Sequence, residues 1–152
     1  MLKLKECVPR IHGVLRTVGV EGANAAALAL RSTPFSPSTA AVVEGEPSAT
    51  FEPLTIDSLA VGNKSAVLSV QVPAGGGFLV FATSYYPGWT VTVDHQTATL
   101  RRTNLATMGV RVPQGRHQIE FSFLDPGLRL GAALSVVGLA IWLSLFRRTV
   151  RS

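Results

Sequence analysis

One long apolar segment near the C-terminus limits the folds that this chain can adopt. Residues 127–146, GLRLGAALSVVGLAIWLSLF, contain a single charged side chain, Arg129, near their start. As a helix with ~1.5 Å rise per residue the segment reaches ~30 Å, about the hydrocarbon thickness of a bilayer. Three arginines follow within residues 147–152. The pattern predicts a transmembrane helix over 127–146 and a basic tail over 147–152; a buried core helix is disfavoured, because the segment is apolar on all sides.

The distribution of charge indicates a membrane flank rather than a nucleic-acid surface. The formal net charge is +5, yet residues 1–126 hold 10 basic and 9 acidic side chains, whereas residues 127–152 hold 4 basic and none acidic. We therefore expect a lipid bilayer as a partner and no nucleic acid. The single cysteine, Cys7, excludes an intrachain disulfide and a multi-cysteine metal site.

Between residues 47 and 126 the hydrophobic pattern has a period of two, which is typical of half-buried strands. Apolar and polar side chains alternate in four segments, 65–72, 89–94, 106–112 and 116–124, and 97–101 can return as a hairpin partner. Residues 78–82, FLVFA, are continuously apolar, as in a strand covered on both faces. Turns that contain Pro and Gly separate several of these segments, at 73–77, 87–88 and 113–115. We predict a mainly β fold, an antiparallel, jelly-roll-like β-sandwich over 47–126.

Residues 1–46 have a different pattern and form a predicted small α/β segment. A strand is expected over 11–18, a helix over 21–31 and a further strand over 39–44. At the other end of the sandwich, Asp125 and Pro126 can cap and start the C-terminal helix. Because almost no linker separates sandwich and helix, the β-domain is expected to lie directly on the bilayer surface.

Motifs that carry catalysis or bind metals are absent from the sequence. The three histidines lie far apart without ligand spacing, and Gly75-Gly76-Gly77 lacks the Lys-Ser/Thr of a phosphate-binding loop. We assign no catalytic residue, no cofactor and no metal site. His117 shares strand parity with Ile119, which favours a strand-end residue over a ligand.

Ser84 to Trp89, SYYPGW, is the one unusual cluster of side chains. Tyr85, Tyr86 and Trp89 lie beside a Pro-Gly turn, where aromatic rings can contact a glycan or a membrane surface. Packing is the alternative, since Trp89 shares strand parity with Val91 and is expected to face the core.

Small residues recur along the predicted membrane helix. Gly131, Ser135 and Gly138 can let another helix approach closely, and they define a candidate helix-packing face. Small residues scattered within a span without a packing role are the alternative.

The arginines at the C-terminus favour a cytoplasmic tail and an extracytoplasmic β-domain, although Arg111, Arg116 and Arg129 weaken this bias. No secretory signal opens the chain. We therefore expect either the end of a longer multi-pass protein, as a fragment or split product, or a tail-anchored protein whose domain stays inside the cell.

Two stretches carry a family resemblance, YYPGWTVTVD (85–94) and GVRVPQGRHQIEFSFLDPGLRLG (109–131). In this order they resemble the C-terminal region of the YfhO-like family of bacterial multi-pass membrane proteins, which is related to polyprenyl-phosphate-sugar-dependent GT-C glycosyltransferases. PRIHGVLRTV (9–18) and PFSP (34–37) resemble the preceding segment of that family. The chain departs from the family pattern at Asp94-His95, where Asp-Gly is frequent, and at Phe35-Ser36-Pro37, where Phe-Asp-Pro is frequent.

The resemblance implies a non-catalytic extracytoplasmic β-domain with the final membrane helix of a glycosyltransferase-like protein that modifies cell-envelope glycans. Partners implied are further transmembrane helices and a glycan. The catalytic acidic residue of GT-C enzymes lies in an early loop that nothing here matches, so no catalytic residue is carried over. A stand-alone, single-span accessory subunit of a membrane complex is the alternative.

Overall fold

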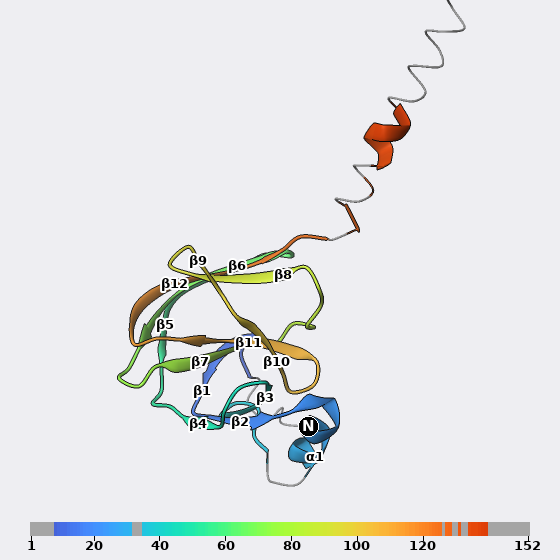
Figure 1. Ribbon diagram of the computed structural model, residues 1–152. Helices are drawn as coiled ribbons and strands as arrows, with labels where there is room; N and C mark the ends of the chain where they lie inside the picture. Colours follow the sequence, from blue (N-terminus) through green and yellow to red (C-terminus); the bar gives the residue numbers. More distant parts are fainter. Residues whose placement is uncertain (1–7, 32–34, 126, 129–130, 132–133, 140–152) are drawn as a thin grey trace, which may run out of the picture.

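Two β-sheets pack against each other in the computed structural model, which describes residues 8–31, 35–125, 127–128, 131 and 134–139. The first sheet has the order β1-β7-β11-β10-β3-β2-β4 and the second has the order β5-β6-β12-β8-β9 (Figure 1). The strands of the first sheet are β1 (Ile11–Val14), β2 (Arg16–Val20), β3 (Ala40–Glu44), β4 (Ala49–Thr50), β7 (Gly77–Phe81), β10 (Leu100–Thr103) and β11 (Thr107–Val112). Those of the second are β5 (Thr55–Val61), β6 (Ser65–Val72), β8 (Trp89–Val93), β9 (Gln96–Ala98) and β12 (Gly115–Phe123).

Neighbouring strands in each sheet are often far apart in the sequence. β12 lies between β6 and β8 in the second sheet, and β11 lies between β7 and β10 in the first. Most neighbouring strands are antiparallel, but β2 and β3 are parallel and are joined by the helix α1 (Gly22–Arg31), the crossover that a parallel pair requires. The predicted mainly β fold of packed sheets is confirmed, with the difference that one sheet is mixed.

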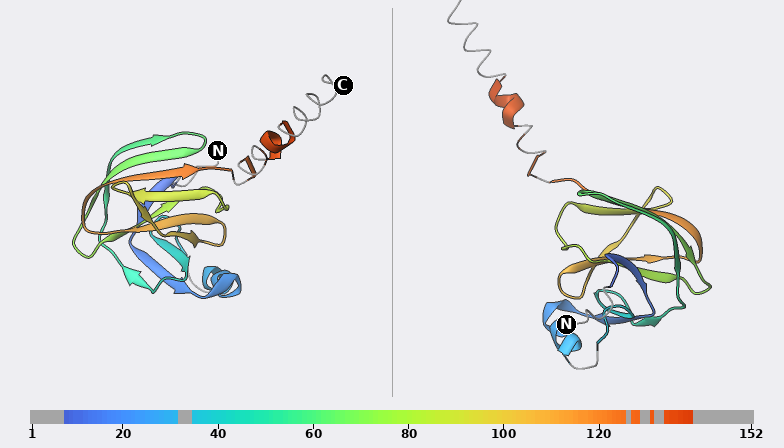
Figure 2. Two further views of the ribbon diagram at one scale, coloured as in Figure 1. Left: turned by 45° about the horizontal axis from the view of Figure 1, so that its top comes forward. Right: turned by 180° about the vertical axis from the view of Figure 1, so that it is seen from behind.

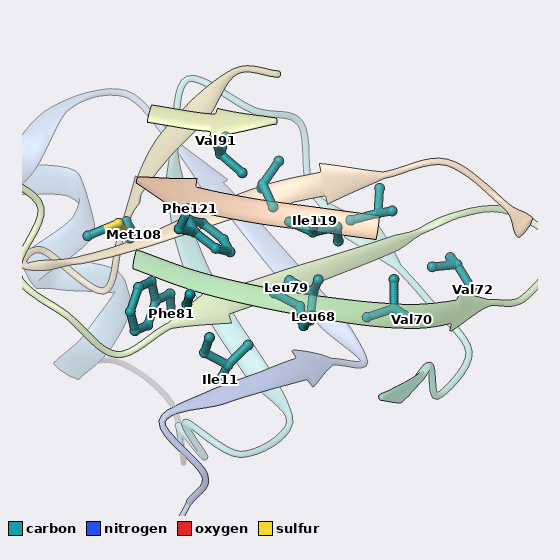
Figure 3. Packing of buried hydrophobic residues seen from close by; sticks show 13 residues of the cluster. Ile11, Leu68, Val70, Val72, Leu79, Phe81, Val91, Met108, Ile119 and Phe121 are labelled. Atoms are coloured by element: carbon teal, nitrogen blue, oxygen red, sulfur yellow. The ribbon is translucent and has the colours of Figure 1, made fainter. Parts of the chain in front are cut away.

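The main hydrophobic core fills the space between the two sheets (Figure 3). Alternate residues of β6 face this core, from Ala66 to Val72, as the period of two predicts. Every residue of β7 is buried, because Leu79 and Phe81 join the main core while Phe78 and Val80 join a second cluster with Val14, Ala41 and Val43. The continuously apolar run was therefore correctly predicted as a strand covered on both faces.

Three features of the strand pattern differ from the sequence prediction. The strand expected over 11–18 is divided at Leu15 into β1, which pairs with β7, and β2, which pairs with β3 and β4. Residues 97–101 divide in the same way, since β9 pairs with β8 whereas β10 lies in the other sheet. β4 and β5 were not predicted.

Strands from both sides of the predicted boundary at residue 46 share one sheet. β1 pairs with β7, and β3 meets β10 at the Val43 and Thr103 pair. The α/β segment over 1–46 thus contributes strands to the sandwich in the described part of the chain, and its status as a separate unit stays a prediction.

Helical residues follow the sandwich at 127–128, 131 and 134–139. The Asp125 Oδ1 atom accepts a hydrogen bond of 2.8 Å from the Gly127 amide, in agreement with the predicted cap, while Pro126 lies outside the described residues. Within the described residues, no helix has the length and apolar character needed to cross a membrane. Much of the predicted span 127–146 and all of the tail 147–152 lie outside the described residues, so both stay predictions.

Candidate functional site

The segment 82–88 connects β7 of the first sheet to β8 of the second and carries the predicted aromatic cluster. Backbone hydrogen bonds hold it at three points. The Ala82 amide donates to the Arg10 carbonyl (2.8 Å), the Tyr85 amide donates to the Ala106 carbonyl (2.6 Å), and the Gly88 carbonyl accepts from the Leu124 amide (2.9 Å). The aromatic side chains are therefore displayed from a segment that is fixed to both sheets.

The rings of Tyr86, Trp89 and Phe123 lie together where this segment meets the end of β12, and Tyr85 of the same segment packs against the main core. We call these four residues the aromatic edge. The half-buried Trp89 ring lies 5.6 Å from the Phe81 ring in T-shaped contact and 5.4 Å from the Phe123 ring. Tyr86 is 57% exposed, with its ring 6.1 Å from that of Phe123. The structure thus brings Tyr86 and Trp89 together through Phe123, with Trp89 against the core as strand parity predicts and with Tyr86 toward solvent. Tyr85 also packs against the core, and its ring contacts Arg102.

The aromatic edge continues into the C-terminal helical residues. Leu124 is 46% exposed and Leu128 is 63% exposed, directly after β12. Further exposed apolar side chains follow at Leu134, Val136, Val137 and Leu139. In Figures 1 and 2 these helical residues lead away from the sandwich beside β8 and β12. Exposed apolar side chains therefore lie both on the aromatic edge and on the described helical residues that follow β12.

Two arginines flank the aromatic edge, and sequence reasoning missed both. The Arg10 guanidinium lies 5.4 Å from the Phe81 ring centre and donates to Thr83 Oγ1 at 3.1 Å. The Arg102 guanidinium lies 5.2 Å from the Tyr85 ring centre. Arg10 and Thr83 are separated by 73 positions, so no local pattern reports their contact.

A second group of polar side chains surrounds the turn between β8 and β9. The Asp94 Oδ2 atom lies 2.6 Å from His117 Nδ1, and Asp94 Oδ1 accepts from the Gln118 amide at 2.9 Å. The other ring nitrogen, Nε2, lies 3.1 Å from the Gln114 carbonyl oxygen. Because both ring nitrogens face hydrogen-bond acceptors, the site suits a protonated imidazolium.

The same contacts explain the direction of both pKa shifts. The hydrogen bond from His117, followed by that from the Gln118 amide, lowers the pKa of Asp94. The hydrogen bond to Asp94 raises the pKa of His117, against the opposing effect of burial.

Asp94 and His117 line an open hollow of about 290 Å³ together with Arg111 and Thr97. No three His, Cys, Asp or Glu side chains are grouped as metal ligands in the part of the chain that the structure describes.

The small residues of the predicted helix-packing face are all within the described residues. The Ser135 hydroxyl donates to the Gly131 carbonyl at 2.9 Å, and a Cβ atom added to Gly131 or Gly138 would meet nothing within 4 Å. The backbone at these glycines is therefore accessible to another helix, and the packing role stays a prediction.

Comparison with known proteins assigns the chain to a protein family. No curated protein and no solved structure matches the chain. The family model described as bacterial membrane protein YfhO matches residues 49–135, more than half of the chain, from β4 through the aromatic edge to the first helical residues. The chain belongs to the YfhO family of bacterial membrane proteins.

Proposed function

We propose that this chain forms a non-catalytic, extracytoplasmic β-domain and the final membrane helix of a glycosyltransferase-like protein of the bacterial cell envelope. The sandwich lies on the membrane surface, and residues 127–146 cross the bilayer. The chain acts together with further transmembrane helices of the protein. Its β-domain positions or binds a ligand and does not carry out the chemical reaction.

The observation that carries this proposal is that exposed apolar helical residues follow the aromatic edge along the chain. Leu124 connects the two, because its amide is bonded to the Gly88 carbonyl and its exposed side chain precedes the helix cap at Asp125. Tyr and Trp rings favour the interface between water and lipid, whereas a row of exposed Leu and Val side chains favours the hydrocarbon layer. Membership of a bacterial membrane protein family supports the same placement.

A non-catalytic role is supported by the arrangement at Asp94 and His117. This acid–histidine pair resembles a general-base arrangement in composition alone, because both imidazole nitrogens are bonded to protein atoms and the carboxylate is bonded to a backbone amide. The pair therefore fits a role in fastening the turn between β8 and β9.

Labelling of single cysteines in intact bacteria tests the topology. In a Cys7→Ser background, Gln96→Cys places a thiol on the exposed strand β9, and Arg151→Cys places one in the predicted tail. A membrane-impermeant maleimide is expected to label Q96C in intact cells and R151C only after permeabilisation. Labelling of Q96C only after permeabilisation would overturn the extracytoplasmic placement.

The open glycines of the C-terminal helix favour a second candidate, a stand-alone accessory subunit that docks through Gly131, Ser135 and Gly138 onto another membrane protein. In this case the chain copurifies with a separately encoded multi-pass protein. Copurification that is independent of these residues would contradict docking through this face.

A further inference from the structure

We propose that Arg10, Lys64 and Arg102 form a basic rim around the aromatic edge and bind the phosphate groups of anionic membrane lipids. The inference rests on the proposed function, in which this edge faces the bilayer, and adds a chemical preference to that contact. The rim is defined by these three residues, which come from three separate parts of the chain.

Arg10 is held in a fixed position with its charge available. Its guanidinium stacks on the Phe81 ring at 5.4 Å and bonds to the neutral Thr83 hydroxyl, so its nearest partners carry no negative charge. The Nε and Nη2 atoms both donate to Thr83 Oγ1, and the Nη1 group, which has no hydrogen-bond partner among the described residues, is left to meet a phosphate oxygen. None of the described carboxylates lies within 4.0 Å of Arg10.

Arg102, in β10, lies over the ring of Tyr85 with its guanidinium 5.2 Å from the ring centre. It lines a hollow of about 310 Å³ with Glu44 and Arg101. Arg101 is paired with Glu46 at 3.1 Å, and neither Glu44 nor any other described carboxylate lies within 4.0 Å of Arg102. Arg102 is therefore exposed, oriented by an aromatic ring, and without an ion pair among the described residues.

Lys64 contributes a third exposed basic residue next to the end of β12. It lies in the turn before β6, and its carbonyl accepts from the Phe123 amide at 2.8 Å, so it is adjacent to the end of β12. The acidic group at this junction, Asp125, is engaged through Oδ1 with the Gly127 amide. The rim thus combines three cations with rings suited to the interface, a combination that favours an anionic lipid surface.

The quenching of Trp89 by brominated lipids tests the inference on the full chain. The sequence has two tryptophans, so Trp142→Phe leaves Trp89 as the sole reporter at the aromatic edge. The protein is reconstituted in vesicles of brominated phosphatidylcholine with or without brominated phosphatidylglycerol. Each basic side chain is expected to favour the anionic headgroup layer by about fivefold. Quenching therefore increases with phosphatidylglycerol, and added salt removes the increase.

Charge variants separate lipid recognition from simple proximity. The double variant Arg10→Gln and Arg102→Gln is expected to lose the increase, whereas Arg10→Lys with Arg102→Lys retains the charge and most of the increase. Arg116→Gln is the matched control, because Arg116 pairs with Asp57 and lies ~23 Å from Phe123 along β12 at ~3.3 Å per residue.

The outcomes distinguish this inference from the proposed function. Quenching that is equal with and without phosphatidylglycerol, or that is unchanged in the double glutamine variant, overturns the basic rim and leaves the membrane-facing edge intact. Absence of Trp89 quenching in either lipid overturns the membrane-facing edge and the rim together.

Discussion

The Asp94 carboxylate fastens the turn between β8 and β9 to the neighbouring strand β12 through His117. The two side chains lie 2.6 Å apart, and the Asp94 and Gln118 residues also exchange hydrogen bonds, with the Asp94 amide donating to the Gln118 carbonyl at 2.8 Å. The His117 side chain is 14% exposed and that of Asp94 is 52% exposed. The contact therefore lies at the boundary between core and solvent, where pH can alter it.

The stability of the sandwich is expected to depend on pH through this pair. Folding raises the pKa of His117 above its ordinary value of 6.5. The stabilisation that the charged His117 gives to the folded state is therefore complete below pH 6.5, and it is lost as the pH rises through the pKa of His117 in the folded protein. Folding lowers the pKa of Asp94 below its ordinary value of 3.8. The stabilisation that the Asp94 carboxylate gives to the folded state is therefore present above pH 3.8, and it is lost as the pH falls through the pKa of Asp94 in the folded protein. The pair stabilises most between these two ordinary values.

Urea denaturation of the full chain in detergent at two pH values checks this dependence. His117→Gln is expected to reduce the free energy of unfolding more at about pH 5.5 than at about pH 8.5. Asp94→Asn is expected to give the same pattern, and the double variant should lose little beyond either single one. Equal losses at both pH values would show that the pair acts without the imidazolium charge.

A second prediction concerns backbone strain in the same turn. Asp94 and His95 have φ angles of 50° and 64°, the combination of a two-residue hairpin turn that favours Asn, Asp or Gly. His95→Gly is therefore expected to raise the free energy of unfolding by about 0.5–1 kcal/mol. Asp94→Gly, with similar φ, is expected to lower stability, because it removes the bonds to His117 and Gln118. Stabilisation by both glycines in denaturation experiments would contradict the role of the Asp94 side chain.

The alternating strands could be predicted from the sequence because burial selects every second residue. In β6 the predicted bounds and faces agree with the structure, from Ser65 to Val72. β5 was missed because all its residues but Ile56 are exposed and its register shifts between Ile56 and Ser58, so no regular alternation remains. The division of the predicted strand at Leu15 could not be predicted from the local sequence either, because there the chain changes from pairing with β7 to pairing with β3.

The candidate site was predictable in composition and not in geometry. Aromatic residues beside a Pro-Gly turn drew attention to Tyr85, Tyr86 and Trp89, and strand parity oriented Trp89. The arginines that stack beside them could not be inferred, because those contacts depend on which strands become neighbours. The contact of Asp94 with His117 has the same origin, since the pairing of Val93 with Ile119 determines it.

A third prediction separates the core from the aromatic edge. Phe121 is fully buried with its ring 5.1 Å from Phe81, so Phe121→Ala is expected to cost about 3–5 kcal/mol in the free energy of unfolding. Tyr86→Ala removes an exposed ring and is expected to change stability by less than about 0.5 kcal/mol, while it reduces the quenching of Trp89 by brominated lipid. A large loss of stability in Y86A would indicate that Tyr86 serves packing rather than membrane contact.

The last prediction concerns association through the C-terminal helix. Because a Cβ atom at Gly131 or Gly138 would meet nothing within 4 Å, Gly131→Leu with Gly138→Leu should leave the sandwich intact and obstruct only a close helix partner. We expect weaker crosslinking or copurification with other membrane helices and an unchanged urea midpoint. Leu134→Ala is the matched control, since it alters an exposed side chain of the same segment without adding bulk at the glycines. Association that persists in the double leucine variant would place the contact on another face of the helix and would remove the support for docking through Gly131, Ser135 and Gly138.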